Sequence, residues 1–240
     1  MYRGRRISLI IPALNEAQTI GPLLAAVDRA IVDGIVVSDN GSRDDTGARA
    51  AAAGACVVRE EKRGYGSACL KAIREGPRAD IYVFMDGDGS DDPREIENLL
   101  TCLMDQDADL VVGSRVTGKA EPGALTFAQK FGNRLTCWLV RLLWGIRYTD
   151  LGPFRAIRRE ALECLAMTDP DFGWTIEMQV KAAQQRLRVR EIPVTYRQRQ
   201  AGRSKVSGSF VGSFHAGQRI LGYVCTAKAK EWWERSVSAR

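Results

Sequence analysis

Short apolar runs alternate with stretches of helical periodicity through the first half of the chain. Runs rich in valine and isoleucine are typical of buried strands, and they cover residues 7–11, 35–38, 56–59, 81–85 and 110–112. The segments between them predict helices over 17–32, 44–53, 67–74 and from 92 onward. Strands that alternate with helices indicate an α/β fold whose mainly parallel sheet is flanked by helices.

Polar side chains follow the ends of these predicted strands. They are Asn15 and Glu16 after the first strand, Asp39 after the second, Asp86 and Asp88 after the fourth, and Ser114 and Arg115 after the fifth. In open α/β sheets, ligands bind beyond the carboxyl ends of the strands. The sequence therefore predicts a carboxylate-rich ligand site at that edge of the sheet.

The fourth strand runs directly into Asp86-Gly-Asp88. Side chains alternate along an extended backbone, so both carboxylates point the same way if the strand continues. Two like charges on one face are tolerated in water, or where a divalent cation such as Mg²⁺ or Mn²⁺ neutralises them with oxygen ligands. The residues alone leave two interpretations open, a metal site and a polar turn.

The charge balance points to an anionic partner. The chain has 240 residues, a formal net charge of +6 and a pI near 9.1, which favours a nucleotide, a phosphorylated substrate or an acidic membrane surface. No nucleic-acid-binding motif is visible. Six scattered cysteines indicate reduced thiols, and the single histidine, His215, excludes a multi-histidine metal site.

Common phosphate-binding and membrane-spanning patterns are missing from the sequence. There is no Gly-x4-Gly-Lys-Ser/Thr loop, and Gly64 and Gly66 begin a dinucleotide fingerprint that breaks at Cys69. The segment from Arg63 is either a phosphate-contacting helix N-terminus or a plain helix-entry turn. No apolar run reaches the roughly 18 residues of a membrane span. We therefore expect a cytoplasmic protein that can rest peripherally on the cytoplasmic face of a membrane.

Seven motifs follow one another along the chain, at residues 8–16, 37–46, 86–88, 113–115, 149–155, 191–197 and 199–205. In this order and spacing they resemble glycosyltransferase family 2, and within it the dolichol-phosphate mannose synthase-like subgroup. The resemblance implies a type A glycosyltransferase fold with a Rossmann-like sheet. It also implies a nucleotide-sugar-dependent domain over residues 1–208 and a C-terminal helical extension over 209–240.

The same resemblance implies a role for individual residues. The residues expected to bind the donor, a GDP- or UDP-sugar, are Pro12, Asn15, Glu16, Asp39, Gly41, Asp86 and Ser204. Those expected to hold Mg²⁺ or Mn²⁺ are Asp86, Asp88 and Ser90. Ser90 stands where the synthase pattern has a metal-binding glutamine, so either Ser90 or Asp91 completes the metal shell.

Catalysis is expected to depend on Asp88 and on a basic segment containing Arg199 and Lys205, which would stabilise the leaving diphosphate. Arg115 and Arg134 are candidates for binding an acceptor phosphate. A polyprenyl phosphate is already ionised and needs no general base, and the family transfers the sugar with inversion. An alcohol acceptor would need a base, for which Glu177 is the leading candidate.

Other functions fit the sequence less well. A nucleotidyltransferase would carry a glycine-rich basic loop after the first strand, where this chain has Pro12 to Glu16. A non-catalytic nucleotide-sugar binder would not need Asp86, Asp88 and the basic segment. Residues 126–144 form either a core helix or an interfacial helix that meets lipid. The aromatic residues after 209 are expected to meet lipid in the same way or to form a homodimer.

Overall fold

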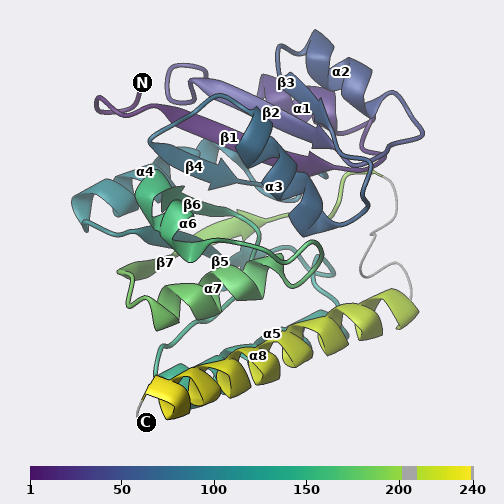
Figure 1. Ribbon diagram of the computed structural model, residues 1–240. Helices are drawn as coiled ribbons and strands as arrows, with labels where there is room; N and C mark the ends of the chain where they lie inside the picture. Colours follow the sequence, from purple (N-terminus) through teal and green to yellow (C-terminus); the bar gives the residue numbers. More distant parts are fainter. Residues whose placement is uncertain (202–209, 239–240) are drawn as a thin grey trace.

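The structure, a computed structural model, describes residues 1–201 and 210–238, and its centre is a seven-stranded sheet (Figure 1). The strands lie in the order β3-β2-β1-β4-β6-β5-β7. They are β1 (Ile7–Ala13), β2 (Gly34–Asp39), β3 (Cys56–Arg59), β4 (Ile81–Phe84), β5 (Leu110–Ala120), β6 (Arg155–Arg158) and β7 (Val189–Tyr196).

The sheet is mainly parallel, as the sequence predicts, with one antiparallel strand near its middle. β1 pairs in parallel with β2 and β4, β2 with β3, and β5 with β7. The short strand β6 lies antiparallel between β4 and β5, with Ala156 opposite both Val83 and Val111. Because β6 runs against both neighbours, β4 and β5 run in the same direction and end at the same edge.

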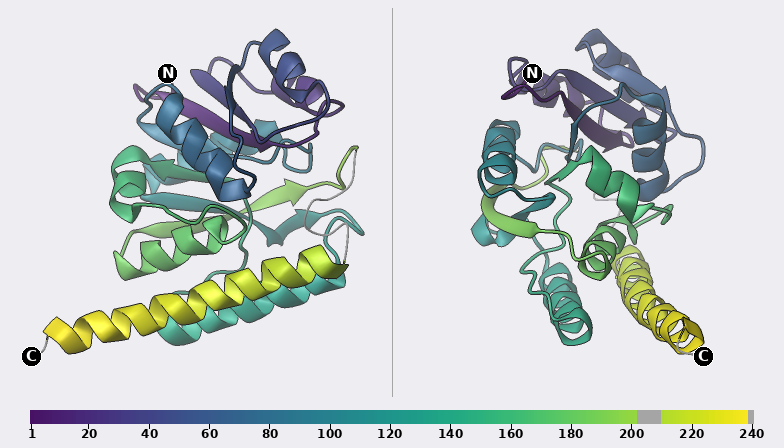
Figure 2. Two further views of the ribbon diagram at one scale, coloured as in Figure 1. Left: turned by 45° about the vertical axis from the view of Figure 1, so that its right-hand side comes forward. Right: turned by 60° about the vertical axis from the view of Figure 1, so that its left-hand side comes forward.

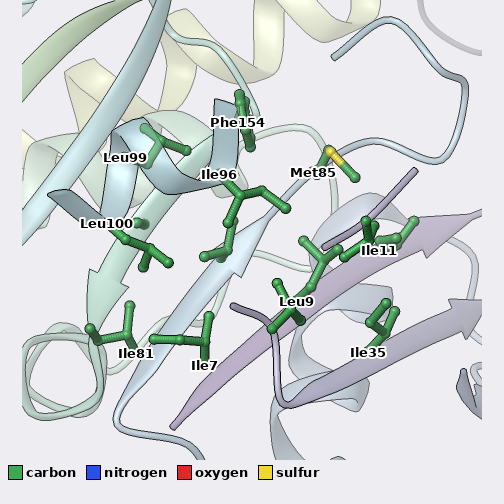
Figure 3. Close-up of a cluster of buried hydrophobic side chains, with 14 of the residues drawn as sticks. Ile7, Leu9, Ile11, Ile35, Ile81, Met85, Ile96, Leu99, Leu100 and Phe154 are labelled. Atoms are coloured by element: carbon green, nitrogen blue, oxygen red, sulfur yellow. The ribbon is translucent and has the colours of Figure 1, made fainter. Parts of the chain in front are cut away.

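Helices cover both faces of the sheet. They are α1 (Ile20–Ala25), α2 (Thr46–Ala52), α3 (Tyr65–Glu75), α4 (Ile96–Asp105) after the 3-10 turn η1 (Pro93–Glu95), α5 (Phe127–Trp144), α6 (Arg159–Leu165), α7 (Trp174–Gln184) and α8 (Phe210–Ser238). Alternate residues of β1 face opposite sides. Ile7, Leu9 and Ile11 join α1 and α4 in one core cluster (Figure 3), while Ile10 joins α3, α6 and α7 in the other.

The predicted helix over 17–32 is wrong in length, because α1 covers only Ile20–Ala25. Polar side chains after it bond to the backbone in place of a continued helix. Asp28 accepts a hydrogen bond from the amide of Ala30 at 2.8 Å, and Asp33 accepts one from the amide of Ile7 at 2.8 Å. These bonds turn the chain into β2.

A pair of long helices, α5 and α8, forms a separate layer beneath the sheet (Figures 1 and 2). Their facing sides share a third core cluster with α7, which includes Val140, Val180 and Val224. α5 begins with a capping box between Thr126 and Gln129. The C-terminal helix is therefore present, as predicted. Within the residues that the structure describes, no helix is long and apolar enough to cross a membrane.

Candidate active site

The loops after β1 and β4 are tied together at the carboxyl edge of the sheet. Thr19, at the start of α1, donates a hydrogen bond through its hydroxyl to the carbonyl of Gly87 at 2.8 Å and another to the carbonyl of Glu16 at 3.1 Å. The Glu16 side chain is buried beside this junction. The sequence-predicted residues of both loops are therefore held close together.

The loop after β4 carries four acidic side chains, of which Asp92 pairs with Arg94 and Arg197. Asp88 and Asp91 are buried, and one oxygen each of Asp86 and Asp91 is buried without a hydrogen-bond partner among the described residues. Burial, and then the charge of Asp88, raises the pKa of Asp86. Burial and the charges of Asp86 and Asp88 raise the pKa of Asp91. This environment disfavours the ionised carboxylates unless positive charge is supplied.

Part of that positive charge comes from Arg199. The chain after β7 crosses the loop, where the amide of Arg197 donates to the carbonyl of Ser90 at 2.8 Å. The Arg199 guanidinium then reaches Oε1 of Glu16 at 2.8 Å and Oδ2 of Asp88 at 2.9 Å. The prediction that Arg199 and Asp88 act in one place thus has a geometric basis, because their side chains form an ion pair.

The carboxylates also fit the chemistry of a divalent cation. In the described part of the chain, no group of three or more histidine, cysteine, aspartate or glutamate side chains is arranged to hold a metal by itself. Mg²⁺ commonly uses one or two carboxylates together with substrate phosphates. The unpartnered oxygen of Asp86 and the adjacent carboxylate of Asp88 suit that mode, in which the donor diphosphate supplies the remaining ligands.

A cavity of about 1500 Å³ extends from these loops to helix α5. Its wall includes Glu16, Asp86 and Asp88 at the strand exits. On and after α5 it includes the basic side chains Lys130, Arg134, Arg141 and Arg147. One cavity therefore joins an acidic end to a basic end. Of these four basic residues, only Arg134 was predicted from the sequence as a site residue.

Arg115 lines the same cavity but is firmly paired. Its Nε and Nη2 donate to the two carboxylate oxygens of Asp150, each at 2.7 Å, and its guanidinium lies 5.0 Å from the ring centre of Tyr196. Although burial lowers it, the hydrogen bonds and charge of Asp150 raise the pKa of Arg115. Nη1 is the guanidinium nitrogen that Asp150 does not bind. Arg134 is exposed and lies on α5.

Glu177 has a different environment from the one a general base needs. The carboxylate is fully buried and accepts hydrogen bonds from the amides of Thr168 and Asp169 and from the hydroxyl of Thr168. Lys181 adds an ion pair at 2.8 Å. Glu177 is not among the side chains of the described residues that line the cavity. Its contacts hold the loop before α7 in place.

The other predicted site residues are placed as follows. Pro12 lines the cavity, whereas Asn15, Asp39, Gly41 and Ser90 are not among the described residues that line it. Asn15 and Asp39 bond to the backbone of the loop after β2, through the amides of Arg43 and Ser42. Ser204 and Lys205 lie outside the described residues.

The glycines at the start of α3 serve close packing. A Cβ added to Gly64 or Gly66 would come within 2.1 Å of the carbonyl oxygen of Pro170 or 1.9 Å of that of Asp169. The amide of Ser67 donates to Pro170. This helix start is therefore occupied by the loop before α7, which favours the helix-entry turn over a phosphate contact through that amide.

A mainly parallel α/β sheet with paired carboxylates and Arg199 at its carboxyl edge is the arrangement expected of a nucleotide-dependent transferase. The chain matches the model of glycosyl transferase family 2 over residues 8–166. It belongs to that family and is a glycosyltransferase.

Known proteins with similar sequences or structures include both lipid-directed and soluble-acceptor enzymes. A Mycobacterium tuberculosis protein described as an uncharacterized glycosyltransferase is 37% identical over 215 residues, covering 89% of this chain and 95% of its own. An undecaprenyl-phosphate mannosyltransferase of Micrococcus luteus is 31% identical, covering 86% and 90%. Glucosyl-3-phosphoglycerate synthase from M. tuberculosis, crystallised with Mn²⁺, UDP-glucose and phosphoglyceric acid, has a TM-score of 0.74 and 25% identity, covering 92% and 80%.

Proposed function

We propose that this glycosyltransferase is metal-dependent and inverting, and that it moves a sugar from a nucleoside diphosphate sugar to a polyprenyl phosphate. The observation that carries the proposal is the charge distribution of the cavity. Glu16, Asp86 and Asp88 lie at one end, and the basic side chains of α5 lie at the other. A cation-bridged diphosphate suits the first end, and an anionic acceptor suits the second.

At the donor end, Asp86 and Asp88 would hold Mg²⁺ or Mn²⁺, which supplies positive charge to the departing diphosphate when bound. Arg199 lies between Glu16 and Asp88. Its guanidinium is therefore within reach of a donor phosphate placed at these carboxylates. In this proposal Arg199, together with Lys205, binds the diphosphate more strongly as negative charge develops on it.

At the acceptor end, Arg134 and Nη1 of Arg115 would orient the acceptor phosphate. An oxygen of that phosphate attacks the anomeric carbon from the side opposite the leaving diphosphate, and the configuration inverts. The phosphate oxygen is ionised near neutral pH, so no proton has to be removed. The buried hydrogen bonds of Glu177 agree with this scheme, as does the name of the Micrococcus relative.

A transfer assay tests the proposal. UDP- and GDP-sugars are first screened with Mn²⁺ by thermal shift, and the stabilising donor is then offered three acceptors: a short polyprenyl phosphate, phosphoglyceric acid and a soluble alcohol. We expect transfer to the polyprenyl phosphate, abolished by EDTA, with inverted configuration in the product. Transfer to the alcohol alone, or undiminished transfer in EDTA, would overturn the proposal.

A further inference from the structure

The outer side of α5 carries large apolar side chains that nothing in the described structure covers. Phe127 is 84% exposed, Phe131 60%, Trp138 55% and Leu142 64%. We call these four residues the α5 stripe. Of the other large apolar side chains reported as exposed among the described residues, two more, Trp232 and Trp233, lie on α8. The exposed apolar surface is therefore concentrated on one layer of the molecule, the helix pair seen beneath the sheet in Figure 2.

The α5 stripe is a single helical face. Its members are separated by four, seven and four residues, which places them along one side of an α-helix. The same helix carries Lys130, Arg134 and Arg141, and no aspartate or glutamate occurs between residues 127 and 144. The exposed side of α5 thus carries large apolar side chains, and every charged side chain on it is positive.

The opposite side of α5 is fully engaged with the protein. Val140 packs with Val224 in the third core cluster. Trp144 donates its ring N–H to Glu231 at 2.7 Å, and the ammonium of Lys228 lies 5.2 Å from the centre of the Trp144 ring. These contacts fix the rotation of α5, so the stripe faces outward because the other side is already buried.

We propose that the α5 stripe inserts into the interfacial region of an anionic lipid bilayer. A helix with an apolar face and a cationic polar face lies in the plane of the interface and is drawn to anionic lipid headgroups. The three cations of α5 exclude a spanning orientation, in agreement with the lack of a spanning helix in the part of the chain that the structure describes.

The charge of α5 also argues for lipid over a second copy of the chain. A two-fold dimer joins the same patch of both subunits. Pairing the α5 stripe with itself would bring two sets of Lys130, Arg134 and Arg141 together, with no acidic residue on either α5 to offset them. An anionic surface satisfies the apolar and the cationic side chains at the same time.

This orientation has a consequence for the reaction, which rests on the proposed function. Trp138 belongs both to the stripe and to the cavity wall, and Arg134 and Arg141 line the cavity as well. A lipid phosphate anchored in the bilayer would therefore enter the basic end of the cavity directly from the membrane surface. Membrane binding itself needs neither donor nor acceptor.

The experiment is cosedimentation with vesicles that contain no polyprenyl phosphate, made of phosphatidylcholine alone or of equal parts phosphatidylcholine and phosphatidylglycerol. We expect partitioning on the order of 10-fold to 10²-fold stronger onto the anionic vesicles, because each basic residue near the surface contributes about fivefold. Raising the salt from about 0.1 M to about 1 M should remove most of this difference.

Two sets of variants separate the causes. Phe127→Ser, Phe131→Ser and Leu142→Ser together change stripe residues outside the cavity wall and should weaken vesicle binding at least about tenfold. The double variant Lys130→Gln, Arg141→Gln should lower the preference for anionic vesicles to about fivefold, because only Arg134 then remains on α5. Its matched control, Arg49→Gln on α2 with Arg74→Gln on α3, should keep the wild-type preference for anionic vesicles.

Far-ultraviolet circular dichroism and thermal shift with nucleotide and Mn²⁺ verify the fold of each variant. If the triple serine variant misfolds, the single variant Phe131→Ser replaces it.

Three results would overturn the inference. The first is wild-type protein that binds neither kind of vesicle, and the second is vesicle binding that the serine variants leave unchanged. The third is a dimer, by sedimentation velocity, that the serine substitutions convert to monomer, since this would assign the stripe to a second copy. Wild-type protein that binds anionic vesicles but transfers no sugar to a polyprenyl phosphate would instead contradict the proposed acceptor alone.

Discussion

The two ends of the cavity are built in different ways. At the donor end, short loops after β1 and β4 carry buried carboxylates. Hydrogen bonds to their backbone fasten them, from the Thr19 hydroxyl to the Gly87 carbonyl and from the Arg197 amide to the Ser90 carbonyl. At the acceptor end, the cations Lys130, Arg134 and Arg141 lie on the exposed surface of one helix. The difference indicates that fixed geometry governs the donor end, whereas charge and access govern the acceptor end.

The largest effect is expected from the donor end. Asp88→Asn should lower kcat/KM on the order of 10³-fold, because the metal site and the ion pair with Arg199 are both lost. Calorimetry should show that the variant loses the Mn²⁺-dependent part of donor binding. The matched control is Asp45→Asn on the exposed start of α2, which should behave like the wild type. Donor affinity that is equal with Mn²⁺ and with EDTA in the wild type would contradict the metal role.

Arg199→Ala should lower kcat about 10²-fold while weakening donor binding much less, because its charge is needed most in the transition state. Lys205→Ala should behave in the same way. Without nucleotide, Arg199→Ala should also bind Mn²⁺ more tightly than the wild type, since the guanidinium no longer pairs with Glu16 and Asp88. Wild-type turnover in either variant would show that the residue is only a surface charge.

Arg134→Ala tests the acceptor end on its own. The acceptor KM should rise about tenfold, as expected for the loss of one charged hydrogen bond, and donor affinity should stay the same. Arg115→Ala is a less selective test, because it leaves the buried carboxylate of Asp150 unpaired and destabilises the fold. Arg78→Ala, an exposed arginine on the connection between α3 and β4, is the control. A change in donor affinity with Arg134→Ala would show that the two ends are not separate.

Glu177→Gln should have the smallest effect on catalysis. Activity should stay above about a tenth of the wild type, whereas loss of a general base costs about 10²-fold to 10⁴-fold. The free energy of unfolding should fall by about 1–3 kcal/mol, because a charged acceptor of several hydrogen bonds is replaced. Steady-state kinetics and thermal unfolding measure the two effects. An inactive variant with unchanged stability would restore Glu177 as the base.

The sequence located the strands at the donor end well, because strands and strand exits leave local signals. The runs at 7–11 and 81–85 locate β1 and β4, and parallel pairing alone brings Glu16 and Asp88 to one edge. The position of β6 could not be read in this way, because its four residues carry no distinctive apolar run and pair only with distant strands.

The burial and the pairing of single side chains also could not be predicted from the sequence. Glu177 was the leading candidate for a general base toward an alcohol acceptor, yet its burial depends on the loop before α7, which folds over it. Arg115 was a candidate for binding an acceptor phosphate, and nothing in the sequence indicated that Asp150 binds two of its nitrogens. Such pairings join residues 35 positions apart, and they follow from tertiary packing rather than from local pattern.

The most direct test of the two-ended cavity compares two acceptors that differ only in charge. A short polyprenyl phosphate and the polyprenol of the same chain length are offered to the enzyme with a saturating donor and Mn²⁺, and kcat/KM is measured for each. The account predicts a preference for the phosphate of at least about 10²-fold, because the basic end recognises the anion and Glu177, the candidate general base for an alcohol, does not line the cavity among the described residues. Equal values, or a preference for the polyprenol, would contradict it.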